Sequence, residues 1–147
     1  MPFKNESFDV VLSSRGPLSS NINFIKESFR VLKKEGLMIE ETIGEKDKIE
    51  LKKIFGRGQN YPNPEIKLVS TKKLLKKTGM KFIGSKYFKF YQTYPSINDV
   101  IKILEKTPVI PDFNKEKDKL YLEKINKKLN KDGIILSSHR LIWLAQK

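Results

Sequence analysis

The stretch that decides the fold is residues 1–42, which read MPFKNESFDVVLSSRGPLSSNINFIKESFRVLKKEGLMIEET. Its two short apolar runs predict buried strands over about 8–14 and 37–43, because unbroken apolar runs are typical of parallel strands covered on both faces. Helical spacing between them predicts a helix over about 22–34, with Gly36 as a left-handed stop. A strand, a helix and a second strand in this order predict a right-handed βαβ unit with parallel strands.

The remainder of the chain predicts two long strands and several helices. Polar and apolar residues alternate over about 80–94 and 134–146, which we expect to form an antiparallel pair of strands. Residues 95–131, between them, predict a small helical insert. The prediction is therefore an α/β fold with a partial Rossmann-like sheet, in a single domain of residues 1–147. Further helices are expected over about 46–55, 72–78 (capped by Ser70 or Thr71 and stopped by Gly79), 97–106 and 115–130.

Composition excludes several classes of protein. Cysteine is absent, so neither disulfides nor thiolate metal sites are expected, and no spacing of other ligands predicts a metal site. No apolar stretch approaches the roughly 20 residues that span a bilayer. Asn5, Glu6 and Asp9 interrupt any run that resembles a signal peptide. These features favour a cytoplasmic protein without a membrane partner.

The net charge of +13 invites a nucleic-acid interpretation, but the kind of basic residue argues for caution. Only four of the 30 basic residues are arginine, the residue preferred for bidentate contacts to phosphates and bases. Lysines spread over every predicted helix indicate a solvated surface first. RNA is kept as a possible substrate.

Two stretches outside the strands carry candidate binding residues. Ser13, Ser14, Arg15 and Gly16 follow the first strand, at the carboxyl end where open α/β sheets bind their ligands. Residues 56–64, GRGQNYPNP, lack the glycine spacing of phosphate-binding loops, so a flexible surface loop is the favoured interpretation. The aromatic residues of the strand over 80–94 fit a half-buried strand better than a nucleic-acid stacking surface.

Several motifs are similar to those of class I S-adenosylmethionine-dependent methyltransferases. Residues 1–11, MPFKNESFDVV, resemble the family's L-P-F-x-D-x-S-F-D-x-V entry into its fourth strand. Residues 29–37, FRVLKKEGL, resemble its x-R-V-L-K-P-G-G turn, with Lys34 and Glu35 in place of Pro-Gly. Residues 78–80, TGM, resemble its A-G-F entry into the sixth strand, and the final strand ends in Ala-x-Lys as the family's often does.

The resemblance implies roles for residues along the whole chain. S-adenosylmethionine is the implied cofactor, with Ser13, Ser14, Arg15 and Gly16 beside its methionine end. The implied acceptor is a small molecule or RNA. Residues 95–131 are the implied substrate lid. The implied substrate-binding residues are Glu41, Thr42, Tyr61 and Tyr94.

One departure from the family is large. The glycine-rich cofactor loop and the ribose-binding acid of such enzymes do not occur in residues 1–147. We therefore expect a fragment, the carboxyl-terminal half of a methyltransferase, that neither binds S-adenosylmethionine nor acts as an enzyme alone. The alternative is a non-catalytic basic module that binds RNA or protein on the same scaffold.

Two features have competing interpretations, and a third predicts self-association. His139 is the only histidine and a candidate general base, but a lone histidine in a strand is more often packed or on the surface. Glu40 and Glu41 are either part of the site or surface charges paired with lysines. The strand over 8–14 is expected to leave an unpaired edge, which predicts a homodimer across it.

Overall fold

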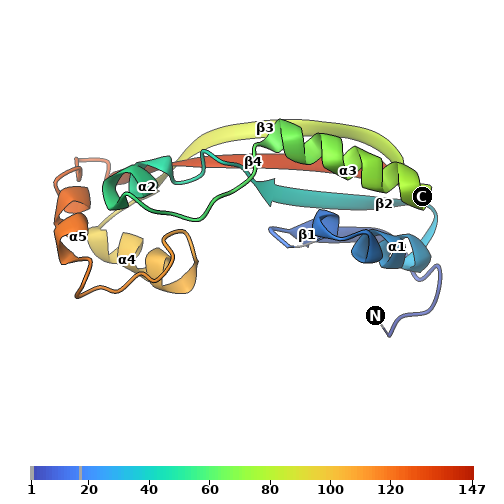
Figure 1. Ribbon diagram of the computed structural model, residues 1–147, viewed down its shortest axis with the longest axis horizontal. Coiled ribbons are helices and arrows are strands. Elements are labelled where there is room, and N and C mark those ends of the chain that lie inside the picture. The colour runs from blue at the N-terminus through green and yellow to red at the C-terminus, as the bar shows by residue number, and fades with distance from the viewer. Residues whose placement is uncertain (1, 17) are drawn as a thin grey trace. The chain divides into compact units, whose positions relative to one another are not determined.

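The computed structural model describes residues 2–16 and 18–147, and these residues form a four-stranded sheet in the order β1-β2-β4-β3 (Figure 1). β1 and β2 are parallel neighbours, and β4 pairs antiparallel to β2. The predicted α/β fold, its parallel pair and its antiparallel final strands are therefore confirmed. The strands are β1 (Phe8–Ser14), β2 (Leu32–Ile43), β3 (Lys81–Tyr94) and β4 (Ile134–Gln146).

The chain packs as two compact units, each with its own hydrophobic core. The first unit comprises Met1–Gly44, Pro62–Phe88 and Arg140–Lys147, and the second comprises Glu45–Tyr61 and Lys89–His139. The helices of the first unit are η1 (Leu18–Ser20), α1 (Ile22–Val31) and α3 (Pro64–Thr78), and those of the second are α2 (Ile49–Phe55), α4 (Ile97–Lys106) and α5 (Lys119–Asn126).

The predicted helix after β1 ends earlier than its sequence pattern suggests. α1 begins after Asn21, whose side-chain oxygen accepts from a main-chain N–H of the first turn, and it ends at Val31 instead of about residue 34. The helix ends early because its last residues contact the segment that contains β1. The main-chain N–H of Ser7 donates to the Val31 carbonyl oxygen at 2.8 Å, and Leu32 already pairs with Phe8 of β1. Strand pairing thus replaces the last turn of the helix.

Gly36 is required for space and not as a left-handed stop. The left-handed residue here is Glu35, with φ of 65°. A Cβ atom at Gly36 would lie 2.9 Å from the Lys33 carbonyl oxygen and 3.1 Å from that of Asp9. Both neighbours are backbone atoms that cannot rotate away, so a side chain at this position would force the main chain to shift.

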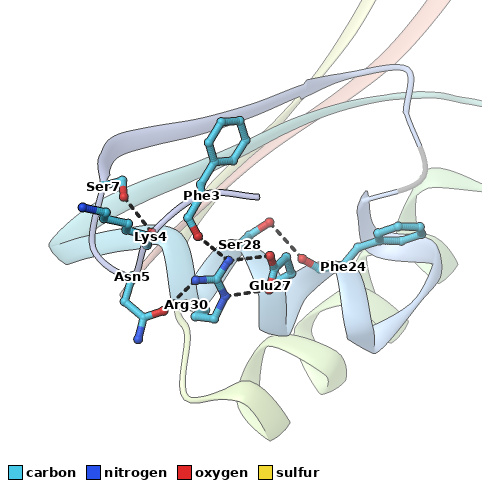
Figure 2. Close-up of polar contacts among 8 residues, drawn as sticks. All are labelled: Phe3, Lys4, Asn5, Ser7, Phe24, Glu27, Ser28 and Arg30. Carbon is cyan, nitrogen blue, oxygen red and sulfur yellow. Dashed lines mark hydrogen bonds and ion pairs between the residues drawn. The ribbon is translucent and has the colours of Figure 1, made fainter. Parts of the chain in front are cut away.

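Arg30 joins the two sequence motifs that decide the fold (Figure 2). Its guanidinium donates to Asn5 Oδ1 at 2.6 Å and to the Phe3 carbonyl oxygen at 2.8 Å. It also donates to both carboxylate oxygens of Glu27, at 2.7 and 2.8 Å, and these hydrogen bonds lower the pKa of Glu27. The segment before β1 is thereby fastened to the end of α1.

The helix after residue 62 is twice as long as predicted. Its cap is Asn63, whose side-chain oxygen accepts from the main-chain N–H groups of Glu65 and Ile66, and Pro64 occupies its first turn. The predicted caps Ser70 and Thr71 lie inside the helix. α1, α3, β2 and β4 enclose the core of the first unit, which contains Ile25, Leu32, Met38, Leu68, Leu75, Met80, Leu141, Trp143 and Ala145.

The second unit contains the predicted insert together with α2 and the loop after it. α4 has the predicted bounds, whereas α5 is shorter than the expected 115–130 because Asn114 caps a separate turn before it. The loop is fixed by Arg57, which donates to both oxygens of the buried Asp118 carboxylate at 2.8 and 2.9 Å. The core contains Leu51, Phe55, Tyr94, Val100, Ile101, Leu104, Val109, Ile110, Leu122, Ile125, Ile134 and Leu136.

Candidate functional site

The first unit brings the predicted cofactor residues and two predicted acceptor residues, Glu41 and Thr42, to one end of the parallel strands. The pairing of β1 with β2 sets Ser14 beside Glu41. The main-chain N–H of Arg15 then donates to the Glu41 carbonyl oxygen at 2.8 Å. Because both strands end here, residues 13–16 and 40–42 form one polar margin, which we call the strand-end rim.

The turn at the end of β1 is tight. Arg15 adopts the left-handed conformation, with φ of 58°, which a residue with a side chain rarely takes. A Cβ atom at Gly16 would lie 2.6 Å from the Ser13 hydroxyl oxygen. Gly16 therefore brings its main chain close to the Ser13 hydroxyl, with no side chain between them.

Glu41 is paired, but with an arginine that the sequence did not single out. Arg140 Nε lies 3.3 Å from Glu41 Oε1, and the arginine side chain is only 11% exposed. Glu41 opposes Ile142 across the β2–β4 pair, so Arg140 is its diagonal neighbour on the same face. The expected pairing with lysine is wrong here, because strand register decides which cation faces this carboxylate. Thr42, the next rim residue, is half-buried.

Glu40 is a buried carboxyl and not a surface charge. Its Oε1 accepts from the main-chain N–H of Ser19 at 3.1 Å, and its Oε2 accepts from Trp143 Nε1 at 3.0 Å. Burial raises the pKa of Glu40, while these hydrogen bonds and the charge of Lys67 oppose the rise. Trp143 lies directly opposite Glu40 across β2 and β4, which explains how this strand pair buries an acid.

The short helix η1 is held next to the rim from two sides. Glu40 accepts from the main chain of Ser19, and Lys67 Nζ of α3 donates to the Ser19 carbonyl oxygen at 3.1 Å. Glu40 and Lys67 therefore hold η1 through the main chain of Ser19. Sequence reasoning missed these contacts, because they join residues far apart in the chain.

His139 lies in the second unit and is 5% exposed. Its main-chain N–H donates to Asp47 Oδ1 at 3.1 Å, and its Nδ1 accepts from the main-chain N–H of Lys46 at 3.3 Å. Burial and the charge of Lys89 lower the pKa of His139, against the pull of nearby carboxylates. The imidazole is therefore neutral at neutral pH, with its proton on Nε2.

Tyr61 lines an open hollow of about 450 Å³ in the second unit. Its hydroxyl donates to Gln59 Oε1 at 2.9 Å, and Lys52 Nζ lies 4.5 Å from the centre of its ring. Burial lowers the pKa of Lys52. A tyrosine hydroxyl and an aromatic-bound ammonium thus share this hollow.

Tyr94 is a core residue of the second unit. It is buried, and its hydroxyl donates to Gln92 Oε1 at 3.1 Å. The same oxygen accepts from Ser138 Oγ at 2.9 Å and from Lys48 Nζ at 2.5 Å. This part-buried network, centred on Gln92, accounts for the tyrosine hydroxyl by hydrogen bonding within the unit.

Residues 2–16 and 18–147 contain neither a candidate metal cluster nor a membrane-spanning helix. No cluster of three or more His, Cys, Asp or Glu side chains there is arranged to hold a metal ion. No helix in the same part of the chain is long and apolar enough to cross a bilayer.

Comparison with known proteins gives matches by structure only. No family model matches this sequence, and no curated protein matches it. A Bacillus halodurans C-125 protein with a provisional methyltransferase designation aligns with a TM-score of 0.59 at 16% identity, over 100% of this chain and 73% of that one. The YcgJ protein of Bacillus subtilis aligns with a TM-score of 0.53 at 14% identity, over 99% of this chain and 65% of that one.

A further neighbour carries a different activity in its name. The cyclase SpnF aligns with a TM-score of 0.50 at 14% identity, over 100% of this chain and 53% of its own. The chain therefore has a class I methyltransferase-like fold and spans about half to three quarters of the length of these neighbours. Likeness at this identity concerns the fold, and one fold hosts several reactions.

Proposed function

We propose that this chain forms the carboxyl-terminal part of an S-adenosylmethionine-dependent methyltransferase, whose cofactor pocket is completed by a glycine-rich part outside residues 1–147. The observation that supports it best is the parallel β1–β2 pair, which carries the family-like motifs within a methyltransferase-like fold. Without the completing part, we expect residues 1–147 to be inactive.

The strand-end rim suits the proposed reaction. Methyl transfer depends mainly on in-line placement of an acceptor against the methyl group that S-adenosylmethionine supplies when bound. In this proposal Ser13, Ser14, Arg15 and Gly16 contact the methionine end of the cofactor. Residues 41 and 42 then face the acceptor, with Arg140 holding the Glu41 carboxylate in place.

The outer edge of β1 supports a missing neighbour. β1 is an edge strand of the sheet, and two side chains on one of its faces are largely uncovered: Val10 is 47% exposed and Leu12 is 69% exposed. An edge strand with uncovered apolar side chains favours pairing with a further strand. In the proposal the additional strand, and the layer that covers Val10 and Leu12, belong to the cofactor-binding part.

Calorimetric titration with S-adenosylmethionine tests the proposal. Residues 1–147 alone should show no binding tighter than about 1 mM, and micromolar affinity would contradict the proposal. The DNA around the gene should encode the glycine-rich part, in frame or as a partner, and adding that part should restore binding.

Two glycine variants sharpen the test in the completed protein. Gly16→Val should weaken cofactor binding, because its Cβ would lie 2.6 Å from the Ser13 hydroxyl oxygen. Gly84→Val is the matched control, since a Cβ there meets no atom within 4 Å. Equal loss in both variants would argue against a role for the rim.

A homodimer is the competing occupant of the β1 edge. Light scattering at tens of micromolar, an approximate range for weak association, separates the two possibilities. A dimer that dissociates when Leu12→Lys is introduced would support self-pairing, whereas a monomer that binds the glycine-rich part would support the methyltransferase.

A basic RNA-binding module is the second candidate function. The net charge of +13 favours it, as does the sequence Lys89-Phe90-Tyr91, in which Tyr91 is 74% exposed. RNA affinity that falls steeply with salt, and falls further in Tyr91→Ala, would support this candidate. Binding that is insensitive to both would remove it.

A further inference from the structure

The second unit contains a pocket of about 210 Å³ with aromatic and charged walls. Ligand sites for drug-sized molecules measure about 300–1,000 Å³, so this pocket suits a small molecule or one end of a larger one. The apolar wall consists of Ile49, Phe90 and Tyr91, and the polar wall consists of Lys46, Glu50, Lys89, Ser137, Ser138 and His139.

The carboxylates around the pocket already have donors. Glu50 Oε2 accepts from the main-chain N–H of Ser137 at 3.0 Å and from its hydroxyl at 2.9 Å. Asp47 accepts from the main-chain N–H of His139 at 3.1 Å. Glu45 also faces the imidazole electrostatically. At least two of these negative charges are therefore bound to groups of the unit itself.

The polar wall also carries two ammonium groups, which differ from the carboxylates in their contacts. Within residues 2–16 and 18–147, neither Lys46 Nζ nor Lys89 Nζ has a hydrogen bond or an ion pair. Lys46 contacts the imidazole of His139 through its main-chain N–H only. Burial lowers the pKa of His139, and the charges of Lys89 and Lys46, which line the same pocket, lower it further.

We propose that this pocket binds a small organic anion with a flat apolar body. The ring of the ligand lies against Ile49, Phe90 and Tyr91, and its anionic group is held by Lys46 and Lys89. Lysine is a point charge that suits a carboxylate or a phosphate equally, so the shared chemistry is an anion on an aromatic body. This site is independent of the methyltransferase proposal, because all its residues belong to the second unit.

His139 provides the assay, since it is the only histidine in the chain. Its imidazole proton resonances are followed by NMR while benzoate, benzamide or benzylamine is added to the wild-type protein. Benzoate should produce saturable shifts at about 0.1–10 mM, and benzamide and benzylamine should bind at least about tenfold more weakly. Phenyl phosphate in place of benzoate distinguishes a phosphate preference from a carboxylate preference.

Lysine variants locate the anionic group. Lys46→Ala keeps the main-chain N–H to the imidazole, and it and Lys89→Ala should each weaken benzoate binding about fivefold, as expected for a partly solvated charge pair. Lys106→Ala, on the exposed end of α4, is the control and should leave the affinity unchanged. The proposal would be overturned by equal affinity for benzoate, benzamide and benzylamine, or by the absence of any shift of the His139 resonances up to about 50 mM benzoate. Wild-type affinity for benzoate in both lysine variants would also overturn it.

Discussion

Replacing Glu40 by alanine is expected to destabilise the first unit by about 2–5 kcal/mol at neutral pH. The change leaves two donors without an acceptor, the main-chain N–H of Ser19 and Nε1 of Trp143, which now donate at 3.1 and 3.0 Å. Each unsatisfied buried donor costs about 1–3 kcal/mol. Removal of a desolvated carboxylate offsets part of this cost, which brings the upper end below the sum of about 6 kcal/mol for the two donors.

The pH dependence separates the charge of Glu40 from its hydrogen bonds. Burial raises its pKa above 4.5, so the folded state binds a proton more readily than the unfolded state. The stability that protonation provides is complete below 4.5 and is lost as pH rises through the folded pKa. Glu40→Gln does not titrate, so the stability of the wild type relative to this variant should fall as pH rises above 4.5.

Urea unfolding followed by tryptophan fluorescence measures both effects. Trp143 is the only tryptophan, is fully buried and donates to Glu40, so its emission reports on this contact directly. Glu105→Ala, an exposed change on α4, should stay within about 0.5 kcal/mol of the wild type. A stability of Glu40→Ala within the same range would refute the reasoning, as would a solvent-exposed emission maximum in the native wild type.

Three further predictions concern the two units. Gly36→Ala should lower the free energy of unfolding by about 1–3 kcal/mol, because the added Cβ would lie 2.9 and 3.1 Å from two backbone oxygens, and unchanged urea midpoints would contradict this. Asn63→Ala should cost about 1 kcal/mol as a lost helix cap, whereas Ser70→Ala should cost nothing measurable, and the reverse order would restore the cap predicted from sequence. Arg57→Ala should destabilise the second unit. Against the effect of burial, the Asn114 main-chain N–H and the Arg57 guanidinium lower the pKa of Asp118, so the loss should be complete above 3.8 and should shrink as pH falls below 3.8 through the folded pKa; a loss that grows on acidification would be inconsistent with that pairing.

The fold could be predicted because its decisive signals are local. Short apolar runs, helical spacing and glycine positions locate β1, α1 and β2 without knowledge of distant partners. The errors lie at element ends. α1 ends at Val31 because Leu32 pairs with Phe8 across the sheet, and no local pattern encodes that pairing. The predicted start of α3 at about residue 72 is wrong, although the sequence does contain the start signal, an Asn-Pro pair at 63–64.

The geometry of the candidate site follows from the sequence only in part, for a related reason. The end of a parallel strand can be read from topology, so residues 13–16 could be named in advance. The burial of Glu40 and the pairing of Glu41 with Arg140 both follow from the register of β2 against β4, which joins residues about a hundred positions apart. Charged residues on a strand reveal their partners only once that register is known.

The unpaired outer edge of β1 affects how the polypeptide is handled in a cell. An uncovered strand with apolar side chains resembles an incompletely folded chain, which chaperones and proteases continuously sort. The abundance of this polypeptide should therefore follow the supply of whatever covers Val10 and Leu12, so that quality control would keep the chain in proportion to the neighbour proposed for this edge.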